Sequence, residues 1–303
     1  MARPLKVGVQ LPEAERDVRW PELREMARTA EAIGLDSVWV GDHLIYRGAG
    51  EPDRSPWDAW TILAGLAAAN ERIELETLVA CHSFHNPAIL ARMATAVDEM
   101  SGGRLILGLG AGWNRAEYET FGIPYDHRAG RFEEAYAIVR GLLKEGHVDF
   151  HGEYYEVADC PLLPKGPRPQ GPPLMIGSFG DRVLRATLPP VDGWNAWHED
   201  YGNTREGLAT LLAKIDRACR DVGRDPATLE KSVAPLVRMP GGAGRGDSPE
   251  QRAIPPITGG PDEIARELRA LAEMGIAHVQ LVLDPITVES IGQLAPVLRA
   301  LDA

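Results

Sequence analysis

Residues 98–121 read DEMSGGRLILGLGAGWNRAEYETF, and they join a helix end, a turn, a buried strand and a glycine-rich strand exit. The Ser-Gly-Gly turn at 101–103 ends the helix, because glycine readily adopts the left-handed conformation of helix C-termini. Gly108, Gly110 and Gly112 then recur at alternate positions of the apolar strand. This alternation predicts a strand face without side chains, which a flat ligand could approach closely. A tight bend with packing glycines is the alternative.

Strand and helix patterns alternate on both sides of this stretch. Continuous apolar runs are typical of parallel strands covered on both faces, and apolar residues at helical spacing indicate the helices between them. The predicted strands are 5–11, 36–41, 73–80, 104–109, 174–177, 191–196, 230–237 and 277–283. The predicted helices are 20–33, 58–69, 86–100, 128–144, 181–187, 204–222, 261–274 and 287–301.

Eight strand–helix units in 303 residues predict an α/β fold, a (β/α)₈ TIM barrel with insertion loops that forms a single domain over residues 1–303. A doubly wound sheet is the alternative, but the sequence lacks a phosphate-binding fingerprint after its first strand. Two Pro/Gly-rich segments, 146–173 and 240–260, interrupt the alternation, and the first has room for a small hairpin. Because long loops in compact domains are usually functional or mobile, we expect them to shape a substrate pocket or a dimer contact.

Charge and cysteine content narrow the class of protein. The chain has 32 basic and 44 acidic residues, a formal net charge of −12, and no basic run, so we expect neither nucleic acid nor membrane as a partner. The three cysteines are far apart and favour a reducing cytoplasm. The N-terminal residues lack the apolar region of a signal peptide, and no apolar run is long enough to span a bilayer.

Candidate catalytic residues fall where the predicted strands end, which is where TIM barrels carry their active sites. His43 is our candidate general acid or base, because histidine titrates near neutral pH. Asp42 precedes it and points to the other side of the strand, which makes it a candidate for holding the turn. Trp113 follows the glycine run, and His82 and His198 are reserve acids.

Residues 177–180, Gly-Ser-Phe-Gly, join a strand directly to a helix and form a candidate phosphate site. Backbone N–H groups at a helix N-terminus bind anions, Ser178 adds a hydroxyl, and Arg182 adds a positive charge. A simple helix cap is the alternative. His82 and His85 have no carboxylate or thiol at ligand spacing, so we expect no metal there.

Four motifs lie in order along the chain: VWVGDHL at 38–44, NPAILARMATAVDEMSGGRLILGLGAGW at 86–113, PPLMIGSFGDR at 172–182 and DGWN at 192–195. Together they resemble the bacterial luciferase-like monooxygenase superfamily, in the branch that uses the deazaflavin coenzyme F420. The resemblance implies a (β/α)₈ barrel, often a homodimer, that holds a flavin-type ring across its C-terminal mouth. It also implies a bulged third strand behind the ring, often with a non-proline cis peptide, at residues 80–83.

The resemblance also implies roles for individual residues. His43 would give or take the proton, with Asp42 and Trp113 nearby. The implied cofactor-binding residues are Ala80, Cys81, His82, Ser83, Ala111, Gly112, Gly177, Ser178, Phe179, Gly180 and Arg182. Two positions depart from the pattern. Ala111 replaces the catalytic glutamate of the branch's sugar-phosphate dehydrogenases, so we do not expect that activity, and His85 replaces an arginine found in many relatives.

The expected function is therefore an F420-dependent oxidoreductase that moves a hydride to or from a small organic substrate with a reducible C=C, C=N or carbonyl group. One alternative is an FMN-dependent monooxygenase that uses reduced flavin, oxygen and a partner reductase. Another is a non-catalytic flavin- or deazaflavin-binding barrel. The barrel scaffold alone does not distinguish them.

Overall fold

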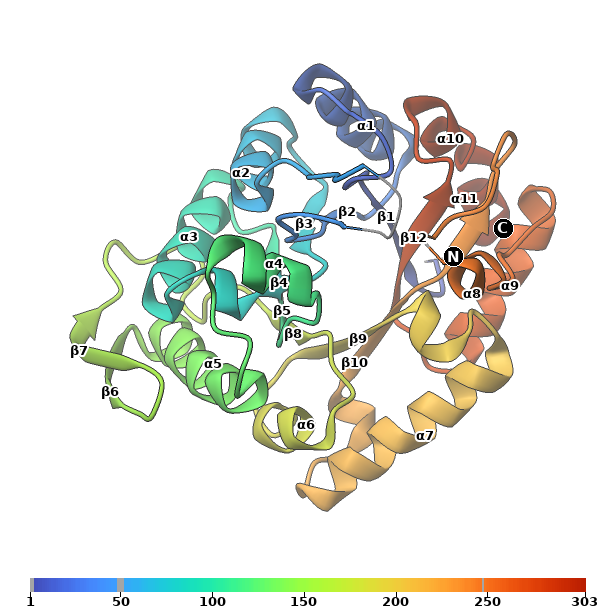
Figure 1. Cartoon of the computed structure of the whole chain (residues 1–303). Coiled ribbons are helices and arrows are strands. Elements are labelled where there is room, and N and C mark those ends of the chain that lie inside the picture. The colour runs from blue at the N-terminus through green and yellow to red at the C-terminus, as the bar shows by residue number, and fades with distance from the viewer. Residues whose placement is uncertain (1–2, 48–51, 247) are drawn as a thin grey trace.

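The computed structural model describes residues 3–47, 52–246 and 248–303 and contains a closed barrel of eight parallel strands (Figure 1). The barrel strands are β1 (Lys6–Gln10), β2 (Ser37–Val40), β3 (Glu74–Thr77), β5 (Leu105–Gly110), β8 (Leu174–Ile176), β9 (Gly193–Trp197), β10 (Glu230–Ala234) and β12 (His278–Asp284). Each strand pairs in parallel with the next, and β1 also pairs with β12, so that Val9 lies opposite both Val38 and Leu281. The predicted (β/α)₈ class is confirmed.

Helices surround the barrel and follow the strands as predicted (Figure 1). They are α1 (Trp20–Ile33), α2 (Ala59–Ala69), α3 (Pro87–Met100), α5 (Arg128–Glu145), α6 (Asp181–Thr187), α7 (Arg205–Asp221) and α9 (Pro261–Glu273). The predicted helix 287–301 is instead two helices, α10 (Val288–Gly292) and α11 (Ala295–Asp302). Pro296 lies in the first turn of α11, where its missing N–H costs nothing, but it could not continue α10.

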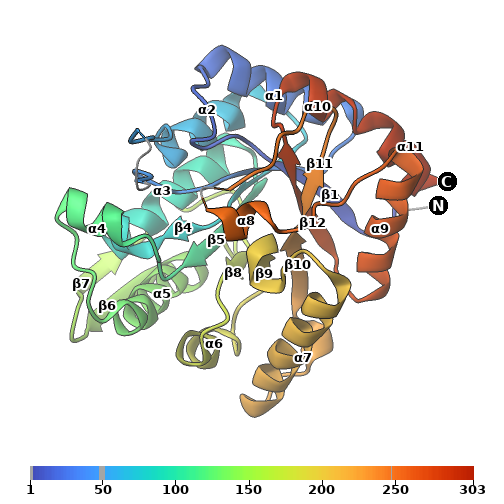
Figure 2. The same cartoon turned by 45° about the vertical axis from the view of Figure 1, so that its right-hand side comes forward.

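Both predicted insertions carry short elements. Residues 146–173 contain an antiparallel hairpin of β6 (His147–His151) and β7 (Glu156–Pro161), which lies beside α5 outside the barrel (Figure 2). The strand predicted at 230–237 is interrupted at Pro235, and β11 (Leu236–Arg238) follows before the second insertion, which contains α8 (Pro249–Arg252). Residues 1–2, 48–51 and 247 lie outside the described residues, and the single-domain assignment over 1–303 stays a prediction.

The third strand differs from the prediction of one element over 73–80. β3 ends at Thr77, the Leu78–Val79 peptide is cis, and β4 (Ala80–Cys81) then pairs with β5. The cis peptide therefore lies two residues before the segment that the resemblance implied. Thr77 anchors the break, because its hydroxyl donates to the Gly108 carbonyl oxygen at 2.7 Å.

The bulge explains the glycines of β5. A Cβ added to Gly110 would lie 2.6 Å from Val79 Cγ2, and one added to Gly177 would lie 2.9 Å from Val79 Cγ1. A Cβ on Gly108 would overlap the Thr77 carbonyl oxygen. The bare face of β5 thus receives the Val79 bulge, which favours the alternative of packing glycines, while Gly110 also belongs to a cavity lining.

The barrel interior is partly polar. Asn195 on β9 donates from Nδ2 to Ser232 Oγ at 2.9 Å and to Gln280 Oε1 at 2.7 Å, and all three residues are buried. Hydrogen bonding across the barrel offsets the cost of burying these groups. None of the helices in the described ranges combines the length and apolar character needed to cross a membrane.

Replacing Gly108 by Ala should lower the free energy of unfolding by about 1–3 kcal/mol, because the new methyl group displaces the Val79 bulge from β5. Urea denaturation measures this. Gly292→Ala is the matched control, since its Cβ would meet only Thr29 Cγ2, at 3.9 Å. Equal effects of the two substitutions would contradict the packing role of Gly108.

Candidate active site

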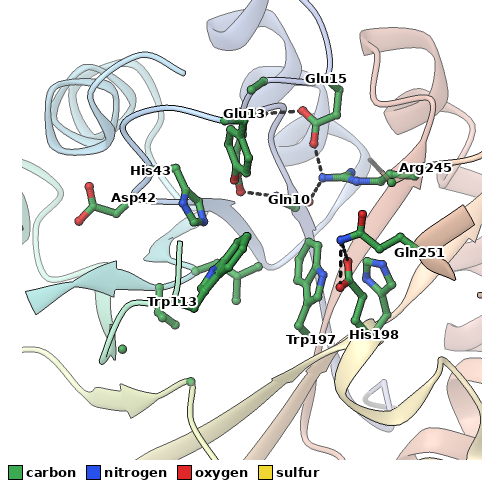
Figure 3. Close-up of a pocket in the computed structure, with 18 of the residues that line it drawn as sticks. Gln10, Glu13, Glu15, Asp42, His43, Trp113, Trp197, His198, Arg245 and Gln251 are labelled. Carbon is green, nitrogen blue, oxygen red and sulfur yellow. Dashed lines mark hydrogen bonds and ion pairs between the residues drawn. The ribbon is translucent and has the colours of Figure 1, made fainter. Parts of the chain in front are cut away.

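A cavity of about 820 Å³ lies at the C-terminal mouth of the barrel, between the strand ends and the loops that follow them (Figure 3). His43 and Trp113 lie on one side of it, and Trp197, His198 and Arg245 lie on the other. The predicted site residues that line it are Asp42, His43, Cys81, Ala111, Gly112, Trp113, Gly177, Ser178, Phe179 and Gly180.

Four predicted cofactor-binding residues are not part of this lining. Ala80 and His82 are buried and do not reach the cavity. Ser83 Oγ lies 3.1 Å from His82 Nε2, and the tautomer of the His82 ring decides which of the two atoms donates the hydrogen bond. Arg182 forms a two-bond ion pair with Glu133 on α5, at 2.8 and 2.7 Å, and lines a separate surface hollow. A role for these four residues in cofactor binding stays a prediction.

His43 is held by a buried carboxylate that the sequence did not single out. His43 Nδ1 lies 3.0 Å from Glu117 Oε1, and the same oxygen accepts from the Leu44 backbone N–H at 2.7 Å. Glu117 belongs to α4 (Arg115–Phe121) and is 1% exposed. A carboxylate at Nδ1 fixes the Nδ1–H tautomer of the neutral ring, which leaves Nε2 for chemistry in the cavity.

The charges around His43 favour its protonated form. Burial lowers the pKa of His43, but the hydrogen bond that it donates to Glu117 and the negative charges of Glu13, Glu117 and Asp42 outweigh this effect. The pKa of His43 is therefore raised above its ordinary value. The Trp113 and Tyr46 rings pack against the imidazole, with centroids 5.8 and 4.8 Å away, and shield one side of it from water.

The two reserve histidines have the opposite character. Burial lowers the pKa of His82 to about 4, and its Nδ1 lies 3.2 Å from the Gly110 carbonyl oxygen. Burial, helped by the charge of Arg245, lowers the pKa of His198 to about 3. Both are neutral at pH 7, so His43 is the better proton donor of the three.

Asp42 supports the backbone rather than the imidazole. Its carboxylate accepts from the Cys81 backbone N–H at 3.1 Å and lies 3.6 Å from His85 Nε2. Figure 3 shows the carboxylate directed away from His43. Burial raises the pKa of Cys81 to about 12, so this thiol stays protonated and is a poor nucleophile.

Part of the cavity wall is a polar network that joins two loops. Gln10 donates from Nε2 to Glu13 at 2.5 Å and accepts from Arg245 at 3.0 Å. Arg245 also pairs with Glu15, and its guanidinium lies 5.7 Å from the Trp197 ring centroid. Arg245 comes from the second insertion, so that loop does contribute to the cavity as expected.

The candidate phosphate loop is tied to the barrel at Ser178. Its carbonyl oxygen accepts from Trp194 Nε1 at 2.8 Å, and its hydroxyl accepts from the Gly180 N–H at 3.4 Å. Gly180 is the N-cap residue of α6 and offers no side-chain cap. Phe179 is 42% exposed at the cavity. Phosphate binding by this loop stays a prediction.

Sequence reasoning missed Glu117 and Arg245. A signal for Glu117 was present, because Asn114 followed by Glu117 has the spacing of a helix N-cap and its third helical residue. Asn114 does cap α4, accepting from the Ala116 N–H at 3.3 Å. Arg245 had no such signal, since only the folded loop brings it to Gln10.

A parallel barrel with its cavity at the strand ends and a carboxylate-held histidine defines a TIM-barrel enzyme site. Residues 4–239 match the sequence profile of the luciferase-like monooxygenase family. The chain belongs to this family, which confirms the resemblance, and its relatives are oxidoreductases and monooxygenases.

Two curated relatives show the range of the family. The chain is 33% identical over 197 residues to an F420-dependent glucose-6-phosphate dehydrogenase of Amycolatopsis mediterranei (strain U-32), covering 63% of this chain and 56% of that protein. It is 32% identical over 185 residues to the pyrimidine monooxygenase RutA of Cronobacter sakazakii (strain ATCC BAA-894), covering 56% and 51%. The chain thus aligns with about half the length of each.

Two solved structures share the fold over nearly the whole chain. An F420-dependent secondary alcohol dehydrogenase in complex with an F420-acetone adduct superposes with a TM-score of 0.79 at 20% identity, covering 98% of this chain and 99% of that one. The monooxygenase RslO1 from Streptomyces bottropensis has a TM-score of 0.77 at 21% identity, covering 97% of each. These likenesses confirm the architecture.

Replacing Glu117 by Gln should lower the pKa of His43, because it removes the charge that raises it. A folded-state pKa above the ordinary 6.5 means that the pair stabilises the fold below that pH, and that this contribution is lost as the pH rises through the folded-state pKa. NMR titration of the His43 ring measures the shift. Glu133→Gln is the control, and an unchanged His43 pKa in Glu117→Gln would contradict the account.

Proposed function

We propose that the chain is an F420-dependent oxidoreductase that transfers a hydride between the deazaflavin and a small organic substrate with a reducible C=C, C=N or carbonyl group. The observation that carries this proposal is the His43–Glu117 pair at the cavity. A raised pKa suits His43 to the single proton transfer that accompanies a hydride transfer.

The cavity fits a flavin-type ring. Its volume of about 820 Å³ leaves room for a three-ring system and a small substrate. Val79 and the backbone of Gly110 and Gly177 form a nearly flat apolar wall, because the two glycines beside the valine have no side chains that project from it. In the proposal, this wall supports the ring and residues 177–180 hold the phosphate of the cofactor's tail.

When bound, the deazaflavin supplies or accepts the hydride. The residues of the chain position the substrate and move the proton. His43 Nε2 gives a proton to the substrate atom that becomes O–H, N–H or C–H on reduction, and it takes that proton back in the reverse direction. Glu117 holds the imidazole ring of His43 in place throughout, and Trp113 and Tyr46 limit the access of water to that imidazole.

An FMN-dependent monooxygenase is the second candidate, because the family includes both chemistries at similar likeness to this chain. The pyrimidine monooxygenase RutA of Cronobacter sakazakii is 32% identical to this chain, against 33% for the F420-dependent glucose-6-phosphate dehydrogenase. FMN shares the ring shape and a phosphate, and it would require oxygen and a partner reductase. A homodimer and a cytoplasmic location are further parts of the proposal that stay predictions.

Fluorescence titration of the purified chain with oxidised F420 and with FMN separates the two candidates. We expect F420 to bind at least about tenfold more tightly than FMN, a difference of about 1.4 kcal/mol. A preference for FMN would move the enzyme to oxygen chemistry. Tight binding without turnover of any carbonyl, imine or alkene substrate would favour the non-catalytic barrel.

Replacing His43 by Ala should reduce turnover by about 10²–10⁴-fold, the usual contribution of a general acid, while the Kd of the cofactor changes little. Steady-state kinetics and the same fluorescence titration measure the two quantities. His151→Gln on the β6–β7 hairpin is the control and should match the wild type. A large loss of cofactor affinity in His43→Ala would make His43 a binding residue instead.

A further inference from the structure

A second cluster of ionisable side chains lies near the N-terminal ends of the barrel strands, away from the cavity. Glu74 and Glu76 on β3 and His278 on β12 each place a potential ligand atom within 4.8 Å of the others. Glu74 and His278 are the first residues of their strands, whereas the cavity residues follow strand ends. The cluster is therefore separate from the proposed active site.

Glu76 is the unusual member of the cluster. It is fully buried, and neither of its carboxylate oxygens makes a hydrogen bond of standard length and angle among the described residues, although the Ser37 side chain interacts weakly with it. A buried carboxylate without partners is costly, so such a group is normally paired with a cation or bound to a metal.

His278 faces Glu76 with a nitrogen that is suited to metal binding. Its Nδ1 lies 3.8 Å from Glu76 Oε1, and its Nε2 lies 2.7 Å from Ser37 Oγ. Ser37 Oγ also accepts from Trp39 Nε1 at 2.6 Å. If Nε2–H donates to Ser37, the Nδ1 lone pair points toward Glu76, which is how outer-shell partners orient metal-ligating histidines.

Gly8 on β1 makes this arrangement possible. β1 lies between β2 and β12, so Ser37 and His278 meet across it. A Cβ on Gly8 would overlap Ser37 Oγ and would lie 2.8 Å from Trp39 Nε1. The absence of a side chain at Gly8 therefore lets the histidine reach its hydroxyl partner.

The surrounding charge favours a cation, and the cluster is open to solvent on one side. Lys6 Nζ lies 2.8 Å from both oxygens of Glu74, and the side chains are 47% and 30% exposed. Glu230 is close enough to interact electrostatically with both Lys6 and Glu76. Three carboxylates thus share one ammonium group, and a metal ion that enters from this side would need only to displace Lys6 from Glu74.

We propose that Glu74, Glu76 and His278 bind one divalent transition-metal ion of the zinc class. Two carboxylate oxygens and one imidazole nitrogen are ligands that Zn²⁺, Co²⁺ and Mn²⁺ accept, with solvent completing the coordination. The ion would join β3 to β12, on either side of the β1–β2 pair where the barrel closes. Its role is structural, because the N-terminal face of a TIM barrel contributes to stability rather than to catalysis.

Titration of the chelator-treated wild-type chain with Co²⁺ tests this proposal without any cofactor. We expect one saturable equivalent with visible d–d absorption, displaced by Zn²⁺, and a Tm that rises with Zn²⁺ concentration because the metal binds the folded state. Absence of saturable Co²⁺ binding by the wild type would overturn the proposal. A protonated Glu76 beside a neutral His278 would then account for the cluster.

Variants locate the metal ion. Glu76→Gln should abolish the Co²⁺ spectrum and the Zn²⁺-dependent rise in Tm, whereas Lys6→Gln should strengthen binding by releasing Glu74. The double variant His147→Gln/His151→Gln is the control. Its two histidines lie near surface carboxylates on the β6–β7 hairpin and could bind Co²⁺ there instead. Loss of binding in this control alone would overturn the proposal. If Glu76→Gln does not fold, the Lys6→Gln variant takes its place in the test. Weaker Co²⁺ binding by Lys6→Gln than by the wild type would then also overturn the proposal.

Discussion

The packing of the Val79 side chain against bare backbone shapes the mouth of this barrel. Gly110 and Gly177 leave room for this side chain, and Gly108 leaves room for the carbonyl oxygen of Thr77. A side chain at any of the three would displace the bulge and the cavity wall that it forms. The glycines of β5 are therefore required for packing.

Electrostatic interactions and burial give the histidines at the barrel mouth different pKa values. His43 is raised in pKa by Glu117 and its acidic neighbours, while burial keeps His82 and His198 neutral. Burial depresses the pKa of an isolated imidazole, and only a nearby negative charge reverses this effect.

The sequence predicted the barrel because its strands are continuous apolar runs, a pattern that survives without knowledge of tertiary contacts. It predicted His43 because this residue lies just beyond the end of a strand. It did not predict Glu117, whose partner is 74 residues away in the chain, or α4, which is too short for a clear helical period. The apolar run gave no sign of the break after Thr77; the family resemblance implied a bulge in this strand, but placed it at residues 80–83 rather than at the Leu78–Val79 peptide.

The central claim is that the cavity binds a deazaflavin ring between the Val79 bulge and His43. A crystal structure of the chain with oxidised F420 tests it most directly. We predict the ring in contact with Val79, its reacting carbon facing His43, and the phosphate at residues 177–180. A ring that binds outside this cavity, or with its reacting carbon facing away from His43, would contradict the account.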